Sequence, residues 1–175
     1  DVESRGLGDV YKRQEQALFM AETEPTEPTE EITETKIKDL DPRFIKQLES
    51  AERSIDKNPG YTIDICATIL AKYPSCVDVR KIMRQAQFKK YGKGNPIAKL
   101  SGDMQGMVLS VKAPSMIKKG QALEVISQAE KLLSHCPQNA PALRALASAA
   151  ESLSYWGTAA SAYMAIAQFQ PGNEK

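Results

Sequence analysis

The sequence is poor in the residues from which most enzyme and metal sites are built. Its 175 residues include one histidine and three cysteines, and 6% are aromatic. No CxxC pair and no cysteine and histidine spacing typical of zinc occurs, so we expect neither a metal ion nor any other cofactor. The histidine, His135, directly precedes Cys136, and adjacent residues of a helix rarely face each other. We therefore expect a non-catalytic protein.

Long apolar runs and a secretory leader are also missing. No stretch approaches the roughly 18 apolar residues that span a membrane, and the first residues do not form a signal peptide. Cys66, Cys76 and Cys136 cannot all pair within one chain, so reduced and mostly buried thiols are expected. These features predict a cytoplasmic protein without a membrane span.

Dense runs of positive charge are absent as well. Residues 1–36 contain four basic and ten acidic side chains, a sum of −6, so the rest must sum to +7 to give the net charge of +1. The basic residues are scattered, without a run of about five and without interleaved aromatic residues. We therefore do not expect nucleic acid as the partner. A helical-repeat RNA binder that uses Lys81 and Lys89 stays an alternative.

The N-terminal part of the chain differs from the rest in composition. Residues 1–14, DVESRGLGDVYKRQ, show no periodicity and resemble the terminal sequence found on some metagenomic assemblies, so we treat them as an artefact. Residues 15–40 contain a stretch made almost wholly of Glu, Thr and Pro, which predicts a disordered acidic arm. An acidic tail that contacts a basic partner is the alternative.

From residue 41 onward the pattern is helical. Asp41 is placed to cap a helix that begins at Pro42, and apolar residues then recur at spacings of 4, 3 and 4. These residues are Phe44, Leu48, Ala51 and Ile55. Further helices are predicted within 61–73, 77–91, 118–136, 140–154 and 157–169. Turns that contain proline or glycine separate them, so consecutive helices form hairpins.

A repeat connects two of these helices. Helix 77–91 presents four apolar residues on one side, and helix 140–154 presents four apolar residues in the same phase, all displaced along the chain by one constant offset. The pairs are Val79 and Ala142, Ile82 and Ala145, Met83 and Leu146, and Ala86 and Ala149. The prolines before the two helices, Pro74 and Pro137, are separated by the same offset. We interpret this shared phase as an internal repeat.

The last complete unit runs from Pro137 to Pro171. This length and pattern resemble a tetratricopeptide repeat (TPR), a unit of about 34 residues. Matching residues are Leu143, Leu146, Ala147, Ala159, Tyr163 and Pro171, whereas Ser154, Ala150 and Ile166 depart from the pattern. The resemblance implies an all-α fold in which antiparallel helix pairs stack as a right-handed α-solenoid over residues 41–171.

Residues 92–117 do not fit the repeat, and we expect an irregular insertion there. Asn95 and Pro96 are placed to start a helix that Pro114 would end. Five apolar residues would share one face of this helix: Ile97, Leu100, Met104, Met107 and Val111. Core packing is the expected role of the methionines, and a soft binding surface is the alternative. The glycine segments GKGNP and SGDMQG are expected to be loops.

The TPR resemblance implies a concave face that binds a peptide or a partner protein. The matching positions are Asp78, Lys81, Gln85, Phe88, Lys89, Arg144, Ser148, Glu151 and Ser152. We therefore expect a protein-interaction scaffold, and a structural subunit of an envelope or secretion assembly is the alternative. Tyr163, Ile166 and Phe169 lie on a last helix with no successor, so we expect a fragment of a longer repeat protein or self-association through this helix, with 172–175 as a tail or the start of a further repeat.

Overall fold

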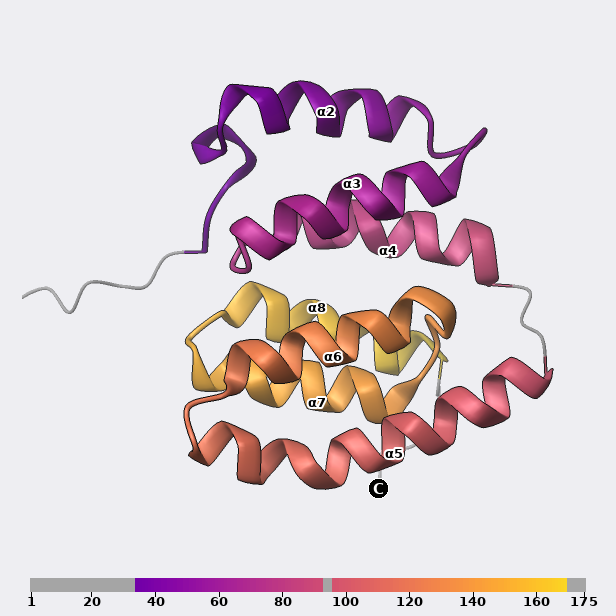
Figure 1. Ribbon diagram of the computed structural model, residues 1–175, viewed down its shortest axis with the longest axis vertical. Coiled ribbons are helices and arrows are strands. Elements are labelled where there is room, and N and C mark those ends of the chain that lie inside the picture. The colour runs from indigo at the N-terminus through magenta and orange to yellow at the C-terminus, as the bar shows by residue number, and fades with distance from the viewer. Residues whose placement is uncertain (1–33, 93–95, 170–175) are drawn as a thin grey trace, which may run out of the picture. The chain divides into compact units, whose positions relative to one another are not determined.

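The structure is a computed structural model that describes residues 34–92 and 96–169, all within one compact unit, Ile32–Lys175. These residues form seven α-helices and one 3-10 helix, and no strand occurs in the described ranges. The elements are η1 (Ile37–Asp39), α2 (Pro42–Arg53), α3 (Pro59–Lys72), α4 (Val77–Tyr91), α5 (Pro96–Lys118), α6 (Ala122–His135), α7 (Ala140–Ser152) and α8 (Trp156–Phe169) (Figure 1). The expected all-α class is confirmed. The expected artefact, most of the acidic arm and the tail at 172–175 lie outside the described residues.

Polar side chains define where several helices begin. Asp41, Asn58 and Asn139 each accept a hydrogen bond from a backbone N–H in the first turn of α2, α3 and α7, at 2.9, 3.2 and 2.8 Å. The first turn of a helix leaves N–H groups without an intrahelical partner, and these side chains satisfy one of them in each case. The predicted cap at Asp41 is therefore confirmed.

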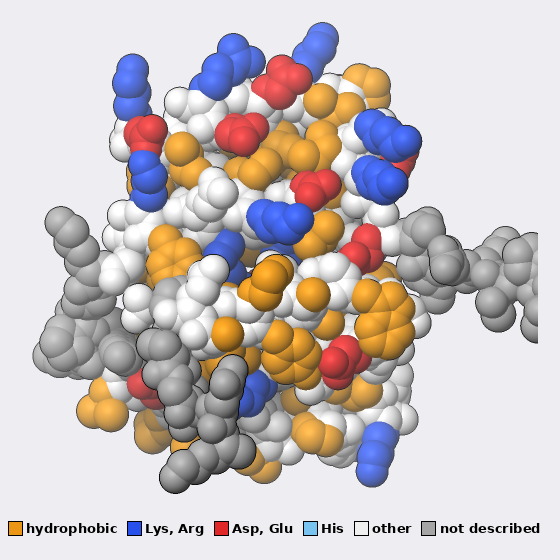
Figure 2. Space-filling view, turned by 180° about the vertical axis from the view of Figure 1, so that it is seen from behind, with side chains coloured by type: hydrophobic (Ala, Val, Ile, Leu, Met, Phe, Trp, Pro, Cys, Tyr) orange, Lys and Arg blue, Asp and Glu red, His pale blue; other side chains and the backbone are white. Residues whose placement is uncertain are grey.

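The helices bury two apolar clusters. The first lies within α2, α3 and α4, where Ile69, Val79 and Met83 are among the most enclosed side chains. The second lies within α5, α6, α7 and α8, around Leu133 and Leu146. All eight apolar residues predicted to face inward from α4 and α7 are buried. In Figure 2, Lys and Arg side chains gather mainly in the upper half, over α2–α4, whereas hydrophobic side chains reach the surface in both halves.

The internal repeat is visible in the backbone. Moving the bounds of α3 along the chain by the offset between Pro74 and Pro137 gives the bounds of α6, and α4 and α7 begin at equivalent residues. The turns after α3 and α6 also match. The N–H groups of Tyr73 and Cys136 donate to the carbonyls of Ile69 and Leu132 at 2.8 and 2.9 Å. The similarity therefore covers the helix pairs α3–α4 and α6–α7; α2–α4 is here called the first unit and α5–α7 the second unit, which α8 follows.

Helix α5 differs from the expected irregular insertion. It runs through Pro114 to Lys118, and it packs against both α6 and α7. Leu109 and Ala113 before the proline are buried, and Met116 and Ile117 after it pack against the same apolar cluster. A proline inside a helix costs about 3 kcal/mol through a lost hydrogen bond and a steric clash. Apolar contacts on both sides of Pro114 offset that cost, which the sequence pattern alone does not reveal.

The segment SGDMQG lies inside α5 and is not a loop. Gly102 and Gly106 are buried where α5 approaches the start of α7. Asn139 donates from Nδ2 to the carbonyl of Gly102 at 2.6 Å while its Oδ1 caps α7. A β-carbon at Gly106 would lie 2.1 Å from that Oδ1 atom. The two glycines therefore permit a close approach between α5 and the capping side chain.

Candidate functional site

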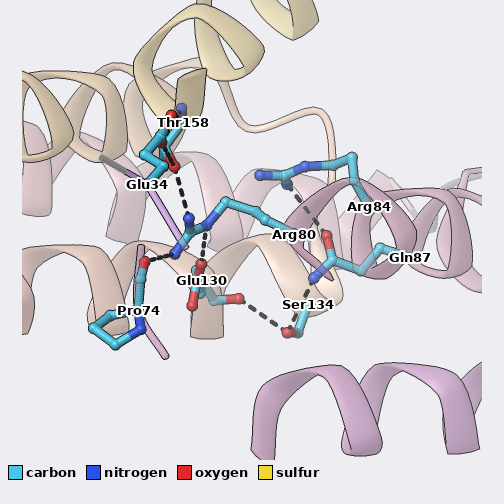
Figure 3. Close-up of polar contacts among 8 residues, drawn as sticks. All are labelled: Glu34, Pro74, Arg80, Arg84, Gln87, Glu130, Ser134 and Thr158. Atoms are coloured by element: carbon cyan, nitrogen blue, oxygen red, sulfur yellow. Dashed lines mark hydrogen bonds and ion pairs between the residues drawn. The ribbon is translucent and has the colours of Figure 1, made fainter. Parts of the chain in front are cut away.

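A polar network joins the α2–α4 unit to α6 and α8. Arg80 of α4 is 2% exposed, and its guanidinium donates to Glu130 of α6 at 2.6 Å. It also donates to the hydroxyl of Thr158 at 2.8 Å and to the carbonyl of Pro74 at 2.9 Å (Figure 3). One buried side chain therefore connects α4, α6, α8 and the turn before α4.

The repeat explains why this interface is polar. Arg80, Arg84 and Gln87 occupy the positions that Leu143, Ala147 and Ala150 hold in the second unit. Those three positions of α7 are buried, in a helix that packs against α8. The same face of α4 carries two guanidinium groups and an amide. The first unit therefore packs against the second unit through hydrogen bonds, whereas α7 packs against α8 through apolar contacts.

Arg84 and Gln87 extend the network along α4. Arg84 donates to the Gln87 side-chain oxygen at 3.2 Å, and Gln87 donates to the Ser134 hydroxyl at 3.4 Å (Figure 3). Removal from solvent lowers the pKa of Arg84 to about 10, with Glu130 acting to raise it and Arg80 acting to lower it. The guanidinium therefore remains charged at neutral pH, and Arg80 and Arg84 present two positive charges beside the carboxylate of Glu130.

A second carboxylate, that of Glu34, approaches the network from the chain that precedes η1. It accepts hydrogen bonds from the backbone N–H groups of Gly157 and Thr158 at 2.7 and 2.8 Å. It also accepts one from the Thr158 hydroxyl at 2.8 Å. The first turn of a helix favours negative charge because its N–H groups point outward. The network thus contains two carboxylates and two guanidinium groups, so its charges balance.

A cleft lies between α3 and α6, beside this network. Its larger part has a volume of about 630 Å³ and a neighbouring part of about 430 Å³, and both are lined by Ala67, Lys131 and Ser134. The larger part is further lined by Ile63, Asp64, Lys90, Tyr91, Ser101, Gly102, Gln105, Leu132, His135 and Cys136. The smaller part adds Leu70, Ala71, Pro74, Met83, Leu123, Ile126, Ser127 and Glu130. Because the parts share lining residues, they form one elongated site, here called the α3–α6 cleft.

The lining of the α3–α6 cleft combines apolar surface with charged side chains of both signs, because Asp64 and Glu130 line it as well as two lysines. Ile63, Leu70 and Ile126 supply aliphatic surface, and Lys90 and Lys131 supply two ammonium groups at the rim. Aromatic and cationic side chains also meet at one end. The Lys90 ammonium lies 5.1 Å from the centre of the Tyr91 ring, and the Tyr91 and His135 rings pack edge to face at 5.7 Å. Such a surface suits an apolar ligand that also carries a charged group.

The chemistry at the Cys136 end of the cleft opposes nucleophilic catalysis. Burial raises the pKa of the Cys136 thiol, and the nearby carboxylate of Asp103 raises it further. A nucleophilic cysteine needs the opposite shift, because the thiolate is the reactive form. In the part of the chain that the structure describes, no three His, Cys, Asp or Glu side chains cluster closely enough to bind a metal ion.

The residues predicted to form a concave face lie on two separate surfaces. Asp78, Lys81, Gln85, Phe88 and Lys89 are on α4, and Arg144, Ser148, Glu151 and Ser152 are on α7. Figure 1 places α6 and α8 between these helices, and both α4 and α7 pack against them. The structure therefore brings each set together on its own helix but does not join the two sets. Their role in binding stays a prediction.

Several of these predicted residues have local partners. Lys81 forms an ion pair with Asp78 at 3.4 Å, and Lys89 forms one with Asp56. On α7, Glu151 lies near Tyr163 of α8, and burial followed by the charge of Glu151 raises the pKa of this tyrosine. Phe88 is half-buried, and the other predicted residues of α7 are exposed. The exposed ion pairs of Lys81 and Lys89 contribute little to stability.

The α3–α6 cleft was not predicted from the sequence, because its two long walls come from helices that belong to different repeat units. One signal was nevertheless present. Comparing the two repeats at every position, and not only at the apolar ones, shows three polar residues of α4 in place of Leu143, Ala147 and Ala150. This difference between the repeats indicates that this face of α4 does not pack against an apolar helix, whereas the equivalent face of α7 does.

Known proteins provide no relative from which a role could be transferred. No family model, no curated protein and no solved structure matches the chain. In the described ranges, every helix is too short or too polar to cross a bilayer.

The cysteines should differ in reactivity. Burial, followed by the charge of Glu52 and the neighbouring Cys76, raises the pKa of Cys66 to about 12, and burial also raises that of Cys76. Both should react with a disulfide reagent at pH 8 only after unfolding, whereas half-buried Cys136 should react in the native protein. Cys136→Ser should remove this native reaction, as measured by absorbance of the released thiol. Its persistence in the variant would contradict the assigned burial.

Proposed function

We propose that this protein is a non-catalytic scaffold that binds a peptide segment of a partner protein in the α3–α6 cleft. The observation that supports this proposal most strongly is the cleft itself. Its two parts have volumes of about 630 Å³ and 430 Å³, much of its lining is apolar, and Lys90 and Lys131 lie at its rim. Ligand sites in proteins typically have volumes of roughly 300–1,000 Å³ and a mostly apolar lining with a few polar groups. A scaffold is favoured over an enzyme because burial and the charge of Asp103 raise the pKa of Cys136, the cysteine that lines the cleft, and so disfavour its thiolate form.

Helix packing supports a TPR-like arrangement as part of this proposal. Helices α5 and α6 form one pair, α7 and α8 form the next, and α7 packs against both members of the first pair. Stacked helix-pair repeats make this set of contacts, because each pair must cover the apolar face of its neighbour. The proposed right-handed solenoid would run through α5–α8, with the α2–α4 unit joined to it through the Arg80 network.

The lining chemistry suggests what the bound peptide contains. Aliphatic walls favour a leucine-like or valine-like anchor, because burying apolar surface drives association. The two lysines favour an acidic side chain or a terminal carboxylate beside that anchor. Buried thiols at Cys66 and Cys76 are consistent with a reducing compartment, and a cytoplasmic location belongs to this proposal.

Selection of binding peptides tests the proposal. The full chain would be presented with a displayed library of random peptides, and affinities of enriched peptides would be measured by fluorescence anisotropy. The enriched sequences should combine an aliphatic anchor with an acidic residue. Ala67→Trp with Lys131→Glu should weaken binding by at least about tenfold, or about 1.4 kcal/mol, because it fills the cleft and reverses one rim charge.

A matched control distinguishes the cleft from the surfaces of α4 and α7. Ser148→Trp with Lys81→Glu makes the same two chemical changes at exposed positions of those helices. The affinity of this control should stay within about twofold of wild type. Loss of binding in the control alone would place the site on α4 or α7. Failure to enrich any peptide would overturn the proposed function.

A further inference from the structure

Helix α5 is apolar on two opposite faces. One face packs against α6 and α7 through Gly102, Gly106, Leu109 and Ala113, all of which are buried. The other face exposes four large apolar side chains. Leu100, Met104, Met107 and Val111 are 75%, 69%, 64% and 76% exposed. The prediction that these four residues share one face of the helix is confirmed, but the prediction that the two methionines fill the core is wrong. The side chain of Ile97, the fifth predicted member of this face, lies outside the described residues.

The spacing of the exposed residues matches a helix-pairing seam. Leu100, Met104, Met107 and Val111 follow one another at intervals of 4, 3 and 4 residues. Apolar residues at this alternation form the contact line of a two-helix coiled coil. Val108 lies next to the seam and is 50% exposed. With a rise of about 1.5 Å per residue, the seam is roughly 16 Å long, so another helix can lie along it for three turns.

The charges near the seam indicate what covers it. Between Leu100 and Val111 the sequence contains no lysine or arginine and one acidic residue, Asp103, and the nearest basic residues, Lys99 and Lys112, lie just beyond the two ends of the seam. The polar neighbours of the seam are Ser101, Gln105 and Ser110, which are uncharged. An anionic membrane surface or an acidic partner would be matched by basic residues along the apolar stripe. A nearly uncharged seam is instead complementary to a second seam of the same composition.

We propose that α5 is a self-association surface that pairs with α5 of a second copy of this chain. A two-fold axis would relate the copies, so that the same patch meets itself. Antiparallel pairing places Leu100 of one copy against Val111 of its partner, and Met104 against Met107. It also opposes the two helix dipoles, which is the more favourable orientation. Leu100, Met104, Met107 and Val111 do not line the α3–α6 cleft, but their neighbours Ser101 and Gln105 do, so the seam borders the cleft.

This surface differs from the last helix, which we predicted from the sequence to mediate self-association. Helix α8 exposes Trp156 and Met164, which are more than two turns apart, and Tyr163 is engaged with Glu151 on α7. Trp156 and Tyr163 are seven residues apart, but the exposed residues that continue this spacing, Ala160 and Ala167, are small, so this face presents two large apolar side chains where α5 presents four. Met164, at 58% exposed, is therefore a suitable control for the methionines of α5.

Sedimentation equilibrium of the full chain tests the proposal. Wild type and Met164→Glu should form dimers, whereas Met104→Glu with Met107→Glu should raise the dimer dissociation constant by at least about a hundredfold. Circular dichroism should show equal helix content in all three, since the changed residues are exposed. A monomeric wild type, dissociation of the Met164→Glu control or an unaltered dimer in the double variant would each overturn the proposal.

A charge exchange tests the antiparallel register. Leu100→Glu alone and Val111→Lys alone should each weaken the dimer, and the two changes together should recover much of the lost affinity. Recovery is expected because antiparallel pairing places each glutamate opposite a lysine of the partner. If the double variant is weaker than either single variant, the antiparallel pairing is wrong. Sedimentation of monomeric wild type with phosphatidylglycerol vesicles, and its loss in Met104→Glu with Met107→Glu, would assign the stripe to a membrane surface.

Discussion

Replacing Arg80 with leucine is expected to lower the free energy of unfolding by about 3–5 kcal/mol. The change leaves the carboxylate of Glu130 without its charged partner and removes the donor from Thr158 and Pro74. Leucine is the residue that the second repeat carries at this position, as Leu143, so size and helix propensity do not explain a large loss. Urea denaturation followed by circular dichroism measures the effect.

Two further variants identify the origin of that loss. Lys81→Leu changes an exposed neighbour on the same helix and should alter stability by less than about 0.5 kcal/mol. Arg80→Leu combined with Glu130→Leu removes both charges and should recover at least half of the loss, because an unpaired buried charge is then absent. If Arg80→Leu is as stable as Lys81→Leu, the network does not join the two units.

Replacing Gly106 with alanine is expected to destabilise the protein by about 2–4 kcal/mol, from overpacking and a weakened helix cap. The new β-carbon would lie 2.1 Å from Oδ1 of Asn139, which accepts the hydrogen bond that caps α7. The same exchange at an unobstructed helical position stabilises a protein by roughly 0.5–1 kcal/mol. The sign of the change therefore reports the contact between α5 and Asn139.

Chemical denaturation also measures this effect, with Gln105→Ala as the control. Gln105 is the exposed neighbour on the same helix, and its replacement should change the free energy of unfolding by less than about 0.5 kcal/mol. A stabilised Gly106→Ala variant would show that α5 does not approach the start of α7 as described.

The helices were largely predictable because their signals are local. Asp41 caps α2 as its sequence context predicts, and the inward positions of α4 and α7 follow from the helical period. The internal repeat was equally visible, since it rests on apolar residues and prolines in fixed phase. Such features depend on neighbours in the chain, so one sequence is sufficient to detect them.

Helix α5 was harder to predict because its course depends on tertiary contacts. Pro114 and the two buried glycines, Gly102 and Gly106, are local signals for breaks and loops. They lie inside a helix because Asn139 and the apolar cluster formed with α6 and α7 contact α5 along its length. Asn139 is distant from Gly102 in the sequence, and no local pattern encodes a contact of this kind.

The candidate site was the least predictable part. The expected concave face combined α4 with α7, as consecutive first helices of a regular solenoid would be combined. The polar face of α4 packs against α6 and α8 instead, which leaves the α3–α6 cleft beside it. Ala67 and Lys131, the residues central to that cleft, have no sequence signature that separates them from ordinary exposed residues.

Amide chemical-shift mapping is the most direct test of whether the α3–α6 cleft binds a peptide. A peptide enriched by the full chain would be titrated into isotope-labelled protein, and shifts would be followed residue by residue. We expect the largest changes at Ala67, Leu70, Ile126 and Lys131. Changes confined to Lys81, Gln85, Arg144 and Ser148, with α3 and α6 unaffected, would contradict binding in the cleft.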